Sequence, residues 1–219
     1  MRMIRAVALA TAIGAASAAS AHAQVIGFRL GLSMSKASIE GEIFEGAEDP
    51  DRTWLTAFTG GGFIRFGAGQ IAIQPELFYV TKGVKFEDEA NDAEGSLKLD
   101  YIEVPVLLFL GLGSGASTPY VVVGPAFSFE ASCSVEAEGG GLSLETDCDE
   151  EGAEDNRKKL DVGAMFGAGL AFPAGPGSIV VDGRFNLGLM NIIDDETDDS
   201  FKHRTFSFTA GYQIPLGVR

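Results

Sequence analysis

The sequence predicts an all-β fold, an eight-stranded antiparallel up-and-down transmembrane β-barrel. Apolar and polar residues alternate along about eight segments, which is the pattern of strands with one apolar face. The links between the segments are alternately long and short, and the long links hold most of the acidic residues. A transmembrane barrel carries long loops at one end and tight turns at the other, whereas a soluble sandwich has no need to do so.

The clearest of these segments is the stretch Leu99–Ser132, which reads as two strands joined by the short turn Gly111–Thr118. One face of its strands is apolar, formed by Ile102, Val104, Val106, Leu108 and Leu110 and then by Val121, Val123, Phe127 and Phe129. The opposite face is small, polar or charged. We expect the apolar face to contact lipid and the polar face to line a narrow lumen.

The remaining strands are expected at Gln24–Ser35, Trp54–Phe66, Ile71–Phe86, Leu160–Phe172, Ser178–Met190 and Arg204–Pro215. Each is long enough for a tilted membrane strand, which needs about 9–11 residues. Four acidic loops are expected at one end: Lys36–Thr53, Glu87–Ser96, Cys133–Lys159 and Asn191–His203. Tight turns rich in Gly and Pro are expected at the other end.

Residues 1–23 have the pattern of a secretory signal peptide, and residues 24–219 then form the barrel domain. Arg2 and Arg5 precede a small, mildly apolar segment, and Ala21-His22-Ala23 matches a cleavage site. No later segment has 18 consecutive apolar residues, so a membrane location requires a closed barrel. The expected location is the outer membrane of a Gram-negative bacterium, with extracellular loops and periplasmic termini.

The charge distribution indicates an ionic lumen. The net charge of −15 argues against nucleic-acid binding, which needs clustered Lys and Arg. A charge facing lipid near the midplane costs about 2–4 kcal/mol, and opposite charges can neutralise one another in a small interior. The charged residues at polar strand positions define the expected lumen network: Arg29, Arg65, Glu76, Lys82, Glu103, Glu130, Asp161, Asp182 and Arg184.

The two cysteines, Cys133 and Cys148, lie in the longest loop and are expected to form a disulfide in an oxidising envelope. The segment that starts at Asp147 resembles the beginning of an EF-hand loop, but Lys158 occupies the twelfth position, where a bidentate Glu is needed. The sequence therefore predicts no metal site and no cofactor. The acidic loops are candidates for loose binding of divalent cations or of a basic protein surface.

The sequence resembles the small bacterial outer-membrane β-barrel family that includes PorT-like proteins. The resemblance covers nearly all of the chain after residue 23, and it rests on Gln74–Tyr79 with Lys82-Gly83, Tyr101–Pro105, Tyr120 with Gly124-Pro125, Gly167–Gly169 and Arg184–Gly188. It implies an eight-stranded barrel in contact with outer-membrane lipid and lipopolysaccharide. It implies no common biochemical activity.

Three functions remain open at this point. The first is a non-enzymatic envelope protein, structural, adhesive or partner-binding through its loops. The second is a narrow conduit for small solutes, although side chains fill an eight-stranded interior. The third is an outer-membrane lipid-modifying enzyme, which would depend on His203, but no Ser-His-acid arrangement accompanies it.

Two further patterns give expectations about individual residues. Glu76 and Glu103 could form a carboxylate pair on adjacent strands, although pairing with Arg65, Lys82 or Arg184 is the expected role. Five aromatic residues are candidates for interfacial girdles: Trp54, Tyr79, Tyr101, Tyr120 and Tyr212.

Overall fold

The structure is a computed structural model of the 219-residue chain. It describes residues 24–40, 51–68, 70–88, 93–113, 115, 117–139, 142–148, 159–189 and 200–216. The predicted signal peptide lies outside these residues. Within them, no helix is long and apolar enough to cross a membrane.

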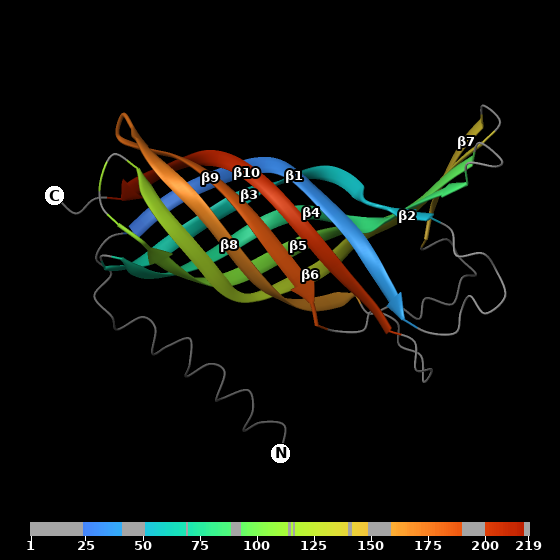
Figure 1. The fold of residues 1–219 in the computed structure, drawn as a ribbon, viewed down its shortest axis with the longest axis horizontal. Helices are drawn as coiled ribbons and strands as arrows, with labels where there is room; N and C mark the ends of the chain where they lie inside the picture. Colours follow the sequence, from blue (N-terminus) through green and yellow to red (C-terminus); the bar gives the residue numbers. More distant parts are fainter. Residues whose placement is uncertain are drawn as a thin grey trace, which may run out of the picture.

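Eight long strands close into a single antiparallel barrel, which confirms the predicted fold class (Figure 1). These strands are β1 (Gln24–Glu40), β3 (Leu55–Ala68), β4 (Ile71–Asp88), β5 (Ala93–Gly111), β6 (Thr118–Gly139), β8 (Leu160–Ala174), β9 (Gly177–Gly188) and β10 (Ser200–Leu216). Each pairs with its neighbours in sequence order, and the β1–β10 ladder joins the first strand to the last. Two short strands lie outside the barrel wall: β2 (Asp51–Thr53) pairs with β4, and β7 (Leu142–Asp147) pairs with β6.

Side-chain alternation gives the barrel an apolar outer surface. On β1, Phe28 and Leu32 are more than half exposed, whereas Arg29 between them is 1% exposed. The same alternation on the other strands builds a continuous outer belt, which includes Phe58, Ile73, Leu77, Ile102, Val123, Phe129, Phe166, Ile179, Phe206 and Phe208. Large exposed apolar belts suit lipid rather than water. We call this surface the apolar belt.

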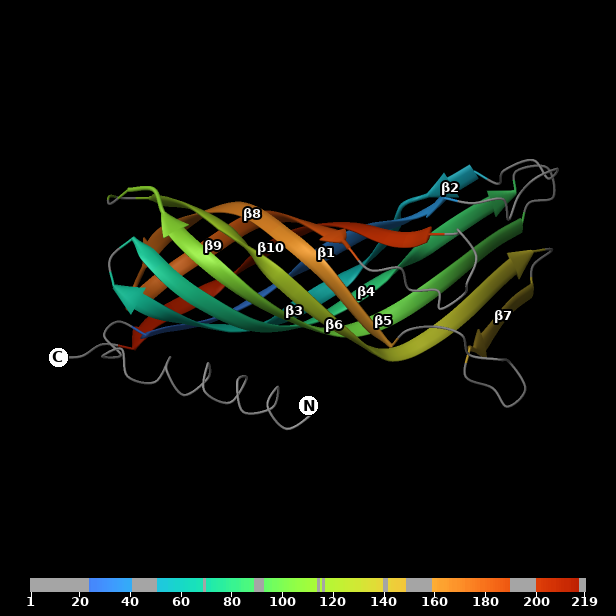
Figure 2. The ribbon, with the colours of Figure 1, turned by 90° about the horizontal axis from the view of Figure 1, so that it is seen from below.

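Tight turns connect the strands at one end of the barrel, which we call the short-turn end. The turn between β8 and β9 places Gly175 at φ 61°, a left-handed conformation that glycine adopts without steric cost. The other ends of the eight strands, which longer stretches of sequence connect, lie opposite it at what we call the long-loop end (Figures 1 and 2).

The predicted loop boundaries are wrong at the long-loop end, because several strands continue beyond the apolar belt. β1 runs to Glu40, β5 begins at Ala93 and β10 begins at Ser200. β6 continues to Gly139 and then pairs with β7, so much of the predicted Cys133–Lys159 loop is a hairpin. Backbone hydrogen bonds can continue a strand beyond the membrane, where lipid no longer requires apolar and polar residues to alternate. The sequence pattern therefore does not show where such a strand ends.

The extended parts of β4, β5 and β6, together with β7, form a sheet that projects from the long-loop end (Figure 2). We call it the projecting sheet. A register shift between Asp100 and Tyr101 lies where the barrel wall passes into this sheet. Asp100, which we expected at a strand end, therefore lies inside β5, and it accepts hydrogen bonds from Thr81 (2.6 Å) and Ser132 (2.7 Å). A bulge of this kind bends and twists a ladder.

Candidate functional site

The lumen holds two networks of buried charged side chains, one nearer each end of the barrel. The first contains Arg29 on β1, Glu76 on β4, and Asp182 and Arg184 on β9, each less than 7% exposed. Arg29 donates to Glu76 at 2.7 Å and also to Asp182. Arg184 donates to Glu76 at 2.6 Å and to Asp182 at 3.1 Å.

Neutral side chains complete the coordination of these two carboxylates. Asp182 also accepts hydrogen bonds from Tyr120 at 2.8 Å and Thr209 at 2.7 Å. Glu76 accepts one from Gln74 at 2.5 Å. Buried charges are tolerated when they are paired and their remaining lone pairs are used, and both conditions hold here.

Arg65 lies nearer the short-turn end, where its described side-chain hydrogen-bond partners are two glutamines rather than Glu76 or Glu103. Its guanidinium donates to Gln74 at 2.7 Å and to Gln213 at 3.2 Å. It stacks over the Phe109 ring, with its Cζ atom 3.5 Å from the ring centroid. This stacking of a planar guanidinium on an aromatic ring fills part of the lumen at this level.

The second network lies nearer the long-loop end and is centred on Lys82 of β4. Its ammonium contacts Glu103 on β5 at 3.2 Å and Asp161 on β8 at 3.1 Å. Ser128 and Asn186 donate to the same Glu103 oxygen at 2.9 and 2.8 Å. Glu76 and Glu103 therefore have separate cationic partners.

The ninth residue of the expected lumen set, Glu130, lies on β6 opposite Tyr101 of β5, beyond the second network toward the long-loop end. The structure thus brings eight of the nine residues into the contacts described above and places Glu130 next to the register shift.

The free volume between the two networks is small. A cavity of about 20 Å³ lies there, lined among others by Glu76, Glu103, Arg184 and Asn186. That volume is room for roughly one water molecule. The lumen is packed rather than open.

Two of the predicted interfacial aromatics are wrong. Tyr101 and Tyr120 are 0% and 2% exposed and face the lumen. The alternation along β5 and β6 places both side chains on the polar, inner face. The prediction relied on residue type instead of this alternation. Trp54 and Tyr79, by contrast, are 40% and 41% exposed on the outside, and Tyr212 is half-buried with its hydroxyl donating to the Ala174 carbonyl at 2.7 Å.

The projecting sheet is tied at its base by the predicted disulfide. Cys133 of β6 and Cys148, directly after β7, are bonded with their Cα atoms 5.4 Å apart. The Cys148 amide donates to the Cys133 carbonyl at 3.1 Å. Cys133 is buried against Leu99 and Tyr101, so the hairpin is fixed both to itself and to the barrel wall.

Acidic residues occupy opposed positions on the projecting sheet. Glu87 of β4 pairs in register with Glu94 of β5, which pairs in turn with Glu138 of β6. Glu136 of β6 is opposite Glu145 of β7. Like charges directly opposite each other weaken a sheet unless something neutralises them. We call these five residues the acidic ladder.

Other predicted positions lie outside the described residues. The EF-hand-like segment is described only to Cys148, and the His203 side chain is not described. Within the described part of the chain, no group of three or more His, Cys, Asp and Glu is arranged to hold a metal ion.

The sequence matches the family described as outer membrane protein beta-barrel domain over residues 17–194. The chain belongs to this family. Membership in the family agrees with the closed barrel and the apolar belt, and it establishes an outer-membrane β-barrel protein. A search of curated proteins found no match.

Solved structures similar to this barrel include proteins with different roles. Ail, the attachment invasion locus protein of Yersinia pestis, was solved in complex with the heparin analogue sucrose octasulfate; it is 14% identical, with 87% of this chain and 99% of that chain covered and a TM-score of 0.42. Neisserial surface protein A is 10% identical, with 86% and 96% covered and a TM-score of 0.44. The outer membrane protease OmpT of Escherichia coli is 11% identical, with 90% and 98% covered and a TM-score of 0.38.

Sequence reasoning missed the neutral members of the networks, notably Gln74, Ser128 and Asn186. Their inward parity was available as a signal, because each alternates with belt residues. It also missed the acidic ladder, because the registers that oppose Glu87, Glu94 and Glu138 depend on strands that read as loops.

Proposed function

We propose that this barrel is a non-enzymatic envelope protein that presents its projecting sheet to a cationic partner outside the cell. In this proposal the long-loop end is extracellular, the termini are periplasmic, and residues 1–23 are removed as a signal peptide before residues 24–219 fold. The proposed partner is a basic protein surface, or divalent cations that bridge to one.

The acidic ladder is the observation that carries the proposal. Three glutamates lie in register across β4, β5 and β6, and another opposed pair lies on β6 and β7. Glu136 is already paired with Lys98. The opposition of Glu94 to Glu87 and Glu138 costs stability in an isolated sheet, so a cationic partner there would remove a repulsion as well as add attractions.

The rigidity of the projecting sheet supports a recognition role. β5 and β6 have 19 and 22 residues, about twice the length needed to cross a membrane at a tilt. The disulfide restricts the β6–β7 hairpin before any partner arrives. A surface that is already ordered loses less entropy on binding than a flexible loop.

The packed lumen argues against the conduit alternative. The cavity of about 20 Å³ between the networks holds roughly one water, and the contacts of Arg29 and Arg184 with Glu76 cross the lumen beside it. The enzyme alternative rests on His203, whose side chain lies outside the described residues. The acidic ladder supports the partner-binding function, which is therefore the one proposed.

A binding measurement with a basic probe tests this function. We expect the refolded protein in neutral detergent to bind immobilised lysozyme, a basic protein, with an affinity that falls steeply as salt rises. The double variant Glu94→Gln/Glu138→Gln should weaken binding by about tenfold, because it removes two ladder charges of roughly 0.7 kcal/mol each.

The matched control is Asp88→Asn/Asp147→Asn, which also removes two acids from the projecting sheet, at positions opposite Ala93 and Ser134 rather than opposite another acid. It should leave binding within about twofold of the unmodified protein. Equal losses for ladder and control variants would mean that net charge alone attracts the probe, and that result would refute the proposal.

A further inference from the structure

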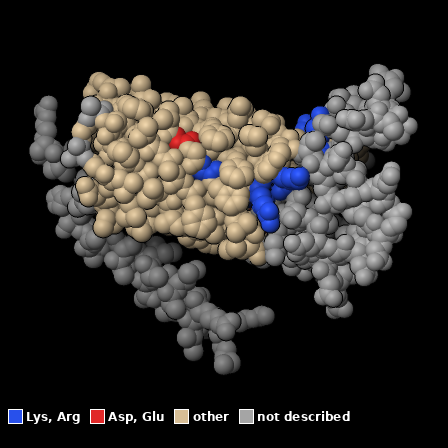
Figure 3. Space-filling model, in the orientation of Figure 1, with Lys and Arg blue, Asp and Glu red and all other residues tan. Residues whose placement is uncertain are grey.

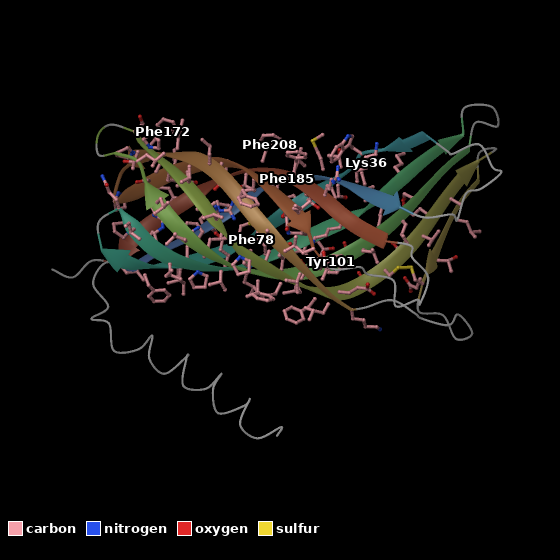
Figure 4. All side chains as sticks on the ribbon, turned by 60° about the horizontal axis from the view of Figure 1, so that its bottom comes forward. Lys36, Phe78, Tyr101, Phe172, Phe185 and Phe208 are labelled. Carbon is pink, nitrogen blue, oxygen red and sulfur yellow. A yellow bond between two sulfur atoms is a disulfide. The ribbon has the colours of Figure 1, made fainter. Side chains whose placement is uncertain are left out.

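The outer surface just beyond the apolar belt carries a basic arc at the long-loop end. On β1 and β10, Lys36 is directly opposite Arg204. Both share strand parity with belt residues such as Leu32 and Phe208, so they lie on the outside of the wall. Figure 3 shows basic side chains at the end of an otherwise nearly uncharged belt, and Figure 4 shows Lys36 on the long-loop side of Phe208.

The arc continues across the next strands through the single tryptophan of the chain. The β1–β3 register pairs Ser35 with Leu55, so Trp54 follows at the level of Lys36. Trp54 is 40% exposed, and its ring lies 5.7 Å from the ring of Phe206, two residues from Arg204. Tryptophan at this level is typical of a membrane–water interface.

Two further lysines complete the arc on the other side of Trp54. Lys85 of β4 is opposite Thr53, and Lys98 of β5 is opposite Gly83, two positions along from Lys85. With Trp54 these lysines line a cleft of about 440 Å³, whose wall also includes Leu55, Ser96 and Glu136. The basic arc is therefore Arg204, Lys36, Trp54, Lys85 and Lys98, carried by adjacent strands.

We propose that the basic arc binds the phosphate groups of an anionic lipid in the outer leaflet, with the acyl chains of that lipid lying on the apolar belt. The proposal rests on the orientation given above, in which the long-loop end faces outward. The arc lies where headgroups meet the acyl region, and each Lys or Arg near such a surface attracts anionic lipid.

Two acidic residues near the arc, Glu136 and Asp100, have partners among the described residues. Glu136 contacts Lys98 at 2.5 Å, with both side chains about one-third exposed. Asp100, one row nearer the belt, accepts hydrogen bonds from Thr81 and Ser132. A lipid phosphate would compete with Glu136 for Lys98, so Glu136 weakens the site without closing it.

The test uses Trp54 as its own reporter, because no other tryptophan contributes to the emission. The refolded full chain in a neutral sugar detergent is titrated with bisphosphorylated lipid A, and native mass spectrometry counts the bound lipid. We expect saturable changes in Trp54 emission and one retained lipid A. Dephosphorylated lipid A should bind at least about tenfold more weakly.

Matched variants assign the effect to the arc. Lys85→Gln/Lys98→Gln should weaken binding about 25-fold, at about fivefold per lysine. Lys159→Gln, directly before β8 (Leu160–Ala174) at the same end, should change binding less than about twofold. Glu136→Gln should tighten binding about threefold, because it frees Lys98. A heat-dependent shift in gel mobility verifies that each variant is folded.

Three results would overturn the proposal. They are unchanged lipid A binding in the Lys85/Lys98 variant, equally tight binding of inorganic phosphate, and binding of polyglutamate in preference to lipid A. The lysozyme measurement depends on Glu94 and Glu138 instead of Lys85 and Lys98. A failure of the partner proposal can therefore be distinguished from a failure of the lipid proposal.

Discussion

Arg184 on β9 donates to Glu76 on β4 at 2.6 Å, and these two strands lie on opposite sides of the barrel. Three strands separate them in either direction around the wall. The pair therefore crosses the whole lumen, and Arg29 joins it from β1. This contact divides the interior and makes the barrel a filled cylinder rather than a channel.

Removing the shared carboxylate should destabilise the barrel strongly. Glu76→Gln leaves Arg29 and Arg184 with Asp182 as their one remaining common carboxylate, so we expect a loss of about 3–5 kcal/mol in the free energy of unfolding. Urea unfolding in lipid vesicles measures it. The control Glu136→Gln breaks a part-exposed ion pair and should cost about 0–1 kcal/mol. Similar costs for both variants would contradict the buried network.

If the apolar belt contacts lipid, an arginine should destabilise the barrel within the belt but not beyond it. Phe208 is 62% exposed within the belt, and Leu144 is 70% exposed on β7, beyond it. Phe208→Arg should reduce the free energy of unfolding in vesicles by about 2–4 kcal/mol, because the charge enters lipid. Leu144→Arg should be nearly neutral. A neutral Phe208→Arg would place that surface in water.

The disulfide should stabilise the projecting sheet locally. A closed loop of about 15 residues contributes roughly 3 kcal/mol in the chain-entropy description. Cys148→Ser should therefore make the β6–β7 hairpin sensitive to protease, while the barrel fragment stays resistant. Limited proteolysis followed by mass spectrometry locates the cuts. Loss of the whole barrel would show that the disulfide holds the fold rather than the hairpin.

Because the lumen is packed, we expect the barrel to conduct no measurable ion current. In planar bilayers the unmodified protein should give no discrete openings, because buried ion pairs cross the lumen beside a cavity of only about 20 Å³. The double variant Glu76→Ala/Arg184→Ala removes the contact that crosses the lumen and should admit water and small ions. Steady openings of the unmodified protein would favour the conduit instead.

The side of the barrel wall that each side chain faces could be predicted from the sequence. Lipid outside and a polar lumen inside impose a strict two-residue period on the strands. This period therefore predicts an inward position for Arg29, Glu76 and Asp182, each of which is buried. Their partners could not be predicted, since Arg184 and Glu76 lie 108 residues apart and meet only once the barrel closes. The projecting sheet was missed for the opposite reason: beyond the lipid, nothing forces Val135 or Leu144 into an alternating pattern.

The requirement for a lipid-like medium is tested most directly by refolding residues 24–219 in three media: detergent-free buffer, detergent micelles and lipid vesicles. We expect a monomeric β-barrel, with β-type circular dichroism and heat-dependent gel mobility, in micelles and vesicles, and aggregation in buffer alone. A folded, soluble monomer in detergent-free buffer would contradict the assignment of the apolar belt to lipid.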